Sequence, residues 1–543
     1  MRRRLTAAEL DGSTPVWCLE LRWGGQVYRL ATQGVDLTMP DGSSTFYVDA
    51  LSEPDFIDEI GREGVQESDS VPLAAYLDGV DVAERIARGF RLERAEASLF
   101  MVLADERGRS LQTWEMRHRY LDGRLSQPQY ADPARPTSWC SFTLEDSGGD
   151  DTSLLLDPAA AVTALTWSAA PSTSNGKPYP TVIGAPGLFR APDGTLTKTS
   201  GSPAYTVTVS GDNAVLVLIA GHEVTAPTVR VFDEAPSGDT LTVVHKLDGL
   251  GRLVACVDVS SSSLNRAHRE FYVCWDNGGG MGSPFSSAAL SGLGDVCAWA
   301  LLRSSLKVDI QRWIAEAGIL NRAEVATYIN DPTITPWSFV TRLLEPFLVE
   351  IRSGPDGIYP QARLLDFASA EALRTVDEGA DFEPVGAVTI RSKLSEIINQ
   401  VTIRFALRSR TGDYRRAITV TADPGPDDTE AFSDEYATLS LNRWPAIQAK
   451  TIELDYIYSD SVAALIASEQ VRVSGFGYSD RLYLASPRWG WLLPGDHIRL
   501  NSATLHRDGL VCQVLSKRWT GLAWEFRLSI DEDPVRASTV KKA

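Results

Sequence analysis

The segment "PRWGWLLPGDHIRLN" (residues 487–501) combines a tight turn with the start of a strand. Pro494 restricts φ, Gly495 tolerates a positive φ, and Asp496 can hydrogen-bond to its own backbone, which favours a turn. Polar and apolar residues then alternate as in a half-buried strand: His497, Ile498, Arg499, Leu500 and Asn501. Asp496 and His497 could instead be half of a catalytic dyad, but no nucleophile or second histidine lies nearby in the sequence. The segment therefore indicates the corner of a barrel strand.

The composition is that of a large globular protein. The 543 residues suffice for about three to four domains. Hydrophobic residues make up 43% and charged residues 23%, which excludes a disordered or collagen-like chain. The net charge of −19 argues against a protein that binds nucleic acid through its phosphates. The acidity could simply keep the protein soluble, or it could provide a surface past which polyanions slide.

Neither the cysteines nor the N-terminus points to export. The six cysteines are scattered without a CxxC pair or zinc-ligand spacing, so we expect reduced, buried thiols made in a cytoplasm. The N-terminal arginines are not followed by an apolar segment, so no secretory signal is expected. The longest apolar runs, such as 214–220, fall short of the roughly 18 residues that a membrane span needs.

The first half of the chain is predicted to be β. Residues 1–150 form an N-terminal β domain, with hairpin turns at Gly24-Gly25 and around Gly108. Residues 151–290 form a strand-rich meander domain with a turn at 210–213, and 188–275 is a possible insertion.

The second half mixes helices with strands. Residues 291–375 form a helical section with a β-hairpin, and Asp295 and Thr335 are the expected N-caps. Residues 376–533 form a C-terminal barrel-like α+β domain that begins with a short helix in "KLSEIINQ", and 534–543 is a tail. An amphipathic helix near 458–473 is expected to bury Val462, Leu465, Ile466 and Val473. The fold class is therefore α+β and β-dominated: a multidomain chain with barrel-like β domains and a small helical section.

A search for catalytic motifs yields only weak candidates. The chain has no GxSxG elbow, phosphate-binding loop, HExxH or EF-hand pattern. His268-Arg269-Glu270 has the HxE of a zinc deaminase without its cysteine pair. Asp276 and Glu350 are examples of acids that could form a glycosidase pair, and nothing in the sequence selects them. Trp489 and Trp491, on one predicted strand face, could stack on sugars or lie in a core. We expect no catalytic, cofactor-binding or metal-binding residues and no enzymatic activity.

Three segments in order resemble one protein family. "NGKPYPTVIGAPG" (175–187), "LSEIINQVTIRFA" (394–406) and the closing segment from Leu484 to Ile530 are similar to parts of the baseplate hub, or tail-tip central protein, of tailed bacteriophages. The helical section between the first two also looks like that of the family. The meander at 188–275 is longer than the family pattern, which leaves its role open.

The resemblance implies a structural role in a virion. Such hubs are homotrimers in which each chain offers two barrel-like domains, so that three chains present a pseudo-sixfold ring to the tail tube. The implied partners are the distal tail or tail-tube protein, the tape-measure protein, and a central fibre or spike. Viral DNA would pass through without specific binding, and the protein would be synthesised in the host cytoplasm. Two other functions stay open: a cell-wall or polysaccharide hydrolase, and a receptor-binding adhesin whose tip is 188–275.

Overall fold

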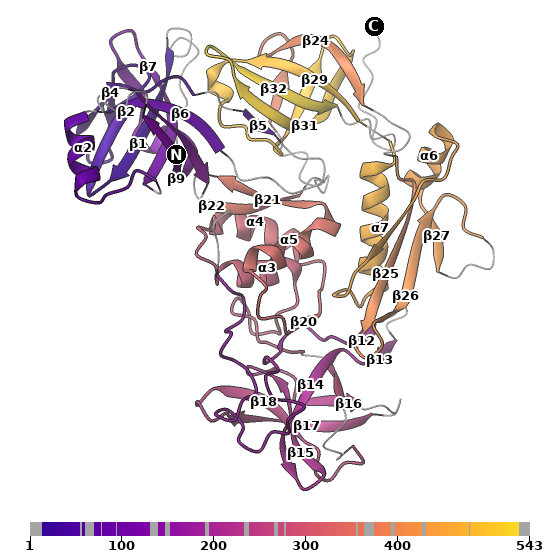
Figure 1. Cartoon of the computed structure of the whole chain (residues 1–543). Coiled ribbons are helices and arrows are strands. Elements are labelled where there is room, and N and C mark those ends of the chain that lie inside the picture. Colours follow the sequence, from indigo (N-terminus) through magenta and orange to yellow (C-terminus); the bar gives the residue numbers. More distant parts are fainter. Residues whose placement is uncertain are drawn as a thin grey trace.

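The computed structural model describes residues 13–54, 57–59, 70–77, 79–93, 95–130, 139–146, 153–190, 195–232, 238–264, 270–275, 279–354, 357–362, 374–391, 397–425, 430–476 and 478–530. Two β domains, one from each end of the chain, lie side by side at one end of the molecule (Figure 1). A helical section lies beneath them, and a small barrel forms the opposite end. Strands predominate in most of these parts, so the expected β-dominated fold class is confirmed.

The N-terminal domain is a curled nine-stranded sheet. Its order is β1-β2-β4-β3-β8-β7-β9-β10-β6, and β1 also pairs with β7. These strands are β1 (Thr14–Trp23), β2 (Gln26–Ala31), β3 (Val35–Thr38), β4 (Ser44–Asp49), β6 (Ser70–Tyr76), β7 (Glu96–Ala104), β8 (Arg109–Thr113), β9 (His118–Tyr130) and β10 (Trp139–Asp146). The Leu51 amide donates to Ala31 O, and Leu51 forms a β-bridge with Ala75. This link joins β2 to β6 and closes a barrel, which we call the N-terminal barrel.

Strand β1 is buried on both faces because it belongs to two cores. Val16 and Cys18 pack in a small cluster with β3 and β4, whereas Trp17 and Leu19 face the interior of the N-terminal barrel. The expected hairpin turn between β1 and β2 is confirmed, since Gly24 and Gly25 both have positive φ. Helix α2 (Gly79–Ala87) packs beside this turn.

The small barrel at the opposite end is closed by six strands in the order β14-β15-β18-β17-β16-β19. They are β14 (Ser202–Ser210), β15 (Asn213–Ala220), β16 (Thr228–Phe232), β17 (Asp239–Leu247), β18 (Leu253–Asp258) and β19 (Phe271–Trp275). The expected turn at 210–213 joins β14 to β15. Tyr179 of the GKPYP segment packs against this barrel and donates a 3.0 Å hydrogen bond to Asp248. We call it the distal barrel; it occupies most of the expected insertion.

The helical section contains α3 (Leu293–Leu301), α4 (Ile310–Leu320), α5 (Pro336–Leu344) and the hairpin of β21 (Val349–Gly354) and β22 (Gly357–Ala362). Thr335 caps α5 as predicted, in a reciprocal capping box with Ser338. Asp295 is not the cap of α3, because the N-cap position is Gly292. The Asp295 carboxylate instead accepts a 2.8 Å hydrogen bond from the side-chain amide of Asn321.

The section 376–533, which the sequence analysis expects as one barrel-like domain, contains two sheets. The first follows the path β23-β30-β31-β32-β29-β24, and we call it the C-terminal barrel. Its strands are β23 (Thr375–Asp377), β24 (Phe382–Arg391), β29 (Tyr478–Ala485), β30 (His497–Ser502), β31 (Arg507–Trp519) and β32 (Trp524–Ile530). The end strands β23 and β24 are joined by a short turn, which curls the sheet. The other proposed domain boundaries stay predictions.

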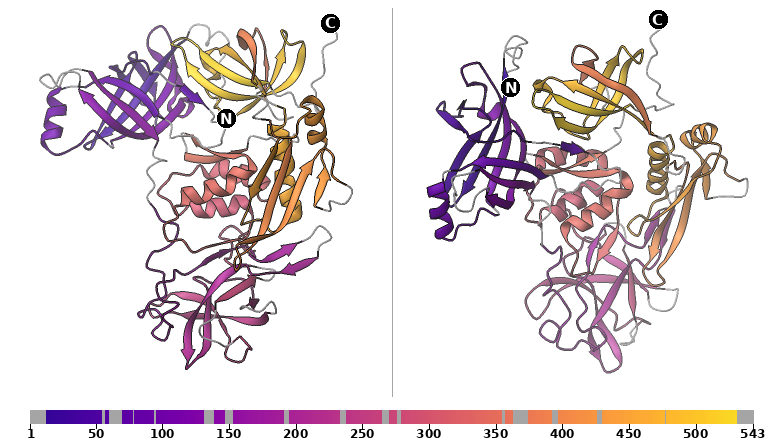
Figure 2. Two further views of the ribbon diagram at one scale, coloured as in Figure 1. Left: turned by 45° about the vertical axis from the view of Figure 1, so that its right-hand side comes forward. Right: turned by 45° about the horizontal axis from the view of Figure 1, so that its top comes forward.

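The second sheet, β27-β26-β25-β28, packs with helix α7 (Asp460–Ser474) against the helical section (Figure 2). Its elements are β25 (Gln400–Arg408), β26 (Asp413–Thr421), β27 (Ala431–Ser433), β28 (Ala449–Glu453) and α6 (Glu435–Arg443). The short helix expected before β25 falls largely on 392–396, outside the described residues, and 397–399 are not helical. In α7, Val462 and Ile466 are buried as expected, but Leu465 is 47% exposed and Val471, not Val473, completes the buried face.

Four short strands form two further sheets of two strands each. β11 (Thr181–Ile183) pairs with β20 (Thr327–Ile329), and β12 (Leu188–Arg190) pairs with β13 (Leu196–Lys198). The tail 534–543 lies outside the described residues.

Candidate functional site

The PGD segment forms the corner that the sequence predicts. The Asp496 amide donates to Leu493 O at 3.0 Å, the Leu493 amide donates to Asp496 Oδ2 at 2.8 Å, and Gly495 has φ +93°. Ile498 and Leu500 are buried in the C-terminal barrel, and the polar residues between them are partly exposed. The interpretation of Asp496 and His497 as a barrel corner is therefore confirmed.

This corner also docks onto the helical section. The Gln361 side-chain amide, at the end of β22, donates to Asp496 Oδ1 at 3.4 Å. The φ of Gly495 favours glycine, and a Cβ there would displace the amide end of the Gln361 side chain that bonds to Asp496. Burial raises the pKa of Asp496, against the opposing effects of the Leu493 hydrogen bond and of nearby Arg312. Asp496 thus serves as a docking residue between two parts of the fold.

Lys517 connects the two large barrels. Its side chain is fully buried, and its ammonium donates to Gly490 O. The ammonium lies 4.4 Å from the ring centroid of Tyr120, in the N-terminal barrel, and 4.3 Å from that of Trp524. The Tyr120 hydroxyl also donates to Gly490 O, at 2.9 Å. A buried ammonium is costly unless compensated, and here two ring faces and a carbonyl surround it.

Aromatic packing surrounds this lysine. Tyr120 stacks on Trp524 with ring centroids 5.4 Å apart, and Trp17 of β1 lies edge-on to Trp519 at 6.1 Å. These contacts merge the interiors of the two barrels into one hydrophobic cluster. Aromatic pairs of this kind add about 0.5–1.5 kcal/mol each beyond the area that they bury.

A strand also crosses between the barrels. β5 (Ile57–Glu59), which belongs to the N-terminal part of the chain, pairs with β31, aligning Asp58 with Lys517. Nearby, the Trp519 indole donates to Glu53 Oε1 at 2.7 Å.

We call the set Tyr120, Gln361, Gly490, Asp496 and Lys517 the three-way junction, because it joins both large barrels to the helical section.

The sequence does not single out Lys517, for an identifiable reason. Burial along β31 alternates through Leu510, Cys512 and Val514, a pattern that would turn Lys517 outward. A register shift between Val514 and Ser516 inserts one residue, and Lys517 then points into the interior. A bulge of this kind leaves no clear signal in the residue pattern.

Of the acids named as examples of a hydrolytic pair, the structure describes Glu350. Glu350 is buried in β21 and lies 3.9 Å from the guanidinium of buried Arg352, which balances its charge. Asp276, His268 and Arg269 lie outside the described residues. Glu270 accepts a 3.0 Å hydrogen bond from the Tyr272 hydroxyl.

The two tryptophans of the opening segment do not share a strand face. Trp489 ends a 3₁₀ turn (Pro487–Trp489) and is buried, whereas Trp491 is 40% exposed. Arg374 lies over both rings, with its guanidinium 4.8 Å from Trp489 and 5.4 Å from Trp491. The prediction of a common strand face was wrong because the chain turns at Gly490.

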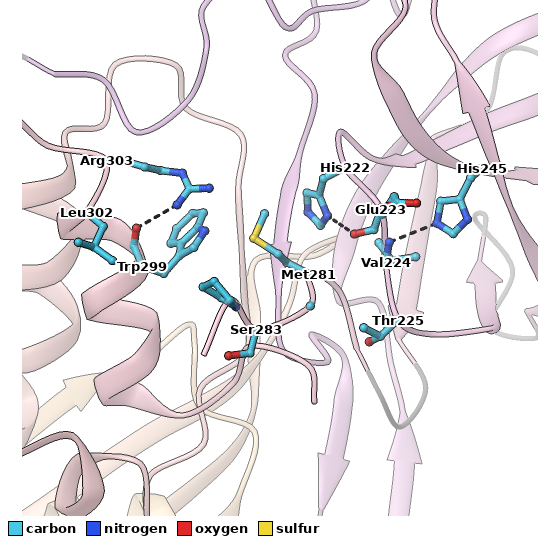
Figure 3. Close-up of a pocket in the computed structure, with 12 residues that line it drawn as sticks. His222, Glu223, Val224, Thr225, His245, Met281, Ser283, Trp299, Leu302 and Arg303 are labelled. Carbon is cyan, nitrogen blue, oxygen red and sulfur yellow. Dashed lines mark hydrogen bonds between the residues drawn. The ribbon is translucent and has the colours of Figure 1, made fainter. Parts of the chain in front are cut away.

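A pocket of about 690 Å³ lies between the distal barrel and α3 (Figure 3). The barrel side contributes His222, Glu223 and His245, and α3 with its C-terminal extension contributes Trp299 and Arg303. The Val182 amide donates to His222 Nε2 at 3.0 Å, and the Val224 amide donates to His245 Nε2 at 3.2 Å. Since an amide can only donate, His222 accepts through Nε2, and its Nδ1, 2.7 Å from Glu223 O, is the nitrogen that carries the proton.

The electrostatics of the pocket agree with this assignment. Burial is the main cause that lowers the pKa of His222, and Arg303 and His245 lower it further. Burial also lowers the pKa of Arg303, which stays charged because its ordinary pKa is so high. The sequence gives no hint of this pocket, since its residues come from segments about 80 positions apart.

The cysteines and the other metal-ligating side chains were the remaining groups to place. All six cysteines are buried and free, as predicted. In the part of the chain that the structure describes, no group of three or more His, Cys, Asp or Glu side chains could hold a metal ion. No helix among the described residues is long and apolar enough to span a membrane.

Comparisons with known proteins give structural likenesses only. No family model matches the chain, and no curated protein matches its sequence. The tail protein from Neisseria meningitidis MC58 covers 95% of this chain and 97% of its own length, at a TM-score of 0.39 and 10% identity. The 43 kDa tail protein of prophage MuSo2 from Shewanella oneidensis covers 95% and 98%, at a TM-score of 0.38 and 10% identity. Over nearly its whole length the chain is thus similar, at this low level, to solved structures of tail proteins.

Proposed function

We propose that this chain is a structural hub of a bacteriophage tail tip or baseplate. In this proposal it forms a homotrimeric ring that joins the tail tube to the tip and lines or closes the DNA channel. Its location is the virion, after synthesis in the host cytoplasm, and it has no catalytic role.

The observation that carries the proposal is the pair of large barrels fixed side by side by the three-way junction. Two barrels per chain become six in a trimer, the number that the resemblance requires for a ring facing a sixfold tube. Within the described part of the chain β24 ends the sheet path of the C-terminal barrel, and a neighbouring subunit could pair with such an edge strand.

The charge of the chain suits a channel for DNA. With a net charge of −19, surfaces facing the lumen would not attract phosphates, so DNA would pass without specific binding. The other partners in this proposal are the distal tail or tail-tube protein, the tape-measure protein, and a central fibre or spike.

The oligomeric state tests the proposal. Light scattering on the purified full chain should give about three times the 59.2 kDa of one chain, and three copies of this chain should be counted in its complex with the tail-tube neighbour. A monomer in both samples would contradict the trimeric hub. A hydrolase has less support, because the buried carboxylate of Glu350 already forms an ion pair with Arg352.

A further inference from the structure

The pocket between the distal barrel and α3 is lined by residues outside the three-way junction. Its volume of about 690 Å³ falls within the range of small-ligand sites, roughly 300–1,000 Å³. The distal barrel and the C-terminal end of α3, whose residues line the pocket, lie apart from the contact between the two large barrels (Figure 1). A ligand there would therefore leave the three-way junction untouched.

One wall of the pocket carries a positioned cation. The Arg303 guanidinium lies 4.2 Å from the centroid of the Trp299 ring and donates to Trp299 O at 3.0 Å. Stacking on the indole and this hydrogen bond fix the orientation of the guanidinium, and the bond engages one guanidinium nitrogen. Arginine has five N–H donors in a fixed fork, so enough remain to bind a carboxylate through two parallel hydrogen bonds.

The same wall contains a buried donor without an acceptor. Trp299 is 3% exposed, and its indole Nε1 has no hydrogen-bond partner in the described part of the chain. Figure 3 shows the indole facing Met281 across the pocket. Unsatisfied buried donors are rare in folded proteins, and methionine is flexible enough to yield to a ligand. An acceptor that enters the pocket would satisfy this N–H.

The opposite wall of the pocket favours a ligand that carries hydroxyl groups rather than a second negative charge. Glu223 is the acidic residue that lines the pocket, and its carboxylate repels anions but accepts hydrogen bonds from hydroxyls. The Ser283 hydroxyl accepts from the Phe285 amide and keeps its own proton to donate. A ligand with one carboxylate and several hydroxyls fits both walls, whereas an acidic peptide places its other charges near Glu223.

We propose that this pocket binds an acidic sugar residue, with the sugar carboxylate on Arg303 and the Trp299 N–H and its hydroxyls on Glu223 and Ser283. This site is independent of the hub proposal: a trimer without sugar binding, or sugar binding by a monomer, would separate the two.

Ligand-observed NMR and calorimetry on the full chain test the site, with methyl glucuronide as probe and methyl glucoside as its uncharged counterpart. We expect saturable binding of the glucuronide and at least tenfold weaker binding of the glucoside, since charged hydrogen bonds contribute about 1.5–3 kcal/mol. Arg303→Met should weaken glucuronide binding at least tenfold. Arg443→Met, which removes an arginine from over Trp444 far from the pocket, should leave it unchanged.

A second variant separates binding from folding. Trp299→Phe keeps an aromatic ring but removes the N–H, and we expect about tenfold weaker glucuronide binding by a chain that still unfolds cooperatively, at a lower thermal midpoint because the smaller buried ring leaves a cavity. Equal binding of glucuronide and glucoside, binding that survives Arg303→Met, or binding of a glutamate-containing peptide in place of the sugar would each overturn the proposal. Absence of any glucuronide binding would do so as well.

Discussion

The two large barrels differ in where their buried polar groups find their partners. The N-terminal barrel closes through backbone bonds at Leu51, and its buried Glu20 accepts a 3.3 Å hydrogen bond from Tyr47 of the same domain. The C-terminal barrel buries Lys517 and Glu378, and its corner carries the partly buried Asp496. Two of these charged groups, Lys517 and Asp496, lie where the C-terminal barrel meets its neighbours. The comparison teaches that the buried carboxylate of the N-terminal domain is bonded within that domain, whereas the C-terminal barrel also places charged groups at its contacts with other parts of the fold.

The largest effect is expected from truncating the lysine of the junction. Lys517→Ala removes the cation from Tyr120 and Trp524 and leaves a cavity, and we expect a loss of about 3 kcal/mol from the stability of the barrel pair. Lys517→Met fills the space without the charge and should cost about 1 kcal/mol. Calorimetry of the full chain measures both. Equal losses would mean that the charge, not packing, dominates the contact.

A second test compares a turn in each barrel. Gly495→Ala meets a positive φ and displaces the end of the Gln361 side chain from Asp496, so we expect a loss of about 2 kcal/mol. Gly25→Ala has a similar φ of +81° but no atom within 4 Å of the new Cβ, and it should cost about 1 kcal/mol. Chemical unfolding provides the measurement. Equal costs would show that the corner is not docked on the helical section.

Acid should weaken the C-terminal barrel through Glu378. Burial alone would raise the pKa of this carboxyl, but hydrogen bonds from Thr504 and Ser502 and the charge of Arg481 outweigh it and lower the pKa. Its contribution is therefore present above the ordinary pKa of about 4.3 and lost as the pH falls through the lowered value. The thermal midpoint of Glu378→Gln should fall less between pH 5 and pH 3 than that of the parent chain. Parallel pH profiles would contradict this assignment.

The smallest effect, of opposite sign, is expected at the junction. Burial raises the pKa of Asp496, so its contribution is complete at low pH and declines as the pH rises through the raised value. Asp496→Asn does not titrate and can still accept from the Leu493 amide. The thermal midpoint of this variant should therefore improve relative to the parent chain from pH 4 to pH 7. A constant difference across this range would show that Asp496 keeps an ordinary pKa.

Signals in short stretches of sequence predicted local structure well, whereas the contacts between parts of the fold were harder to predict. The PGD corner, the Gly24-Gly25 turn and the Thr335 cap were identified because each depends on backbone preferences of adjacent residues. Leu465 was wrongly expected in the core because helix periodicity defines a stripe but not its centre. Lys517 was missed because a bulge changes which residues face inward.

The sites between parts depend on residues far apart in the chain. The insertion of β25 to α7 between strands of the C-terminal barrel is a topological feature, and alternation within each strand is the same with or without it. The pocket likewise combines the turn at His222 with the end of α3. Neither arrangement leaves a pattern in any one segment of the sequence.

Electron microscopy with particle averaging of the purified full chain tests the central claim most directly. If the three-way junction makes the two large barrels one rigid unit of a hub, averages should show a threefold ring with an open centre and six barrel densities around it. Single molecules, or particles in which the two barrels take variable relative positions, would contradict the account.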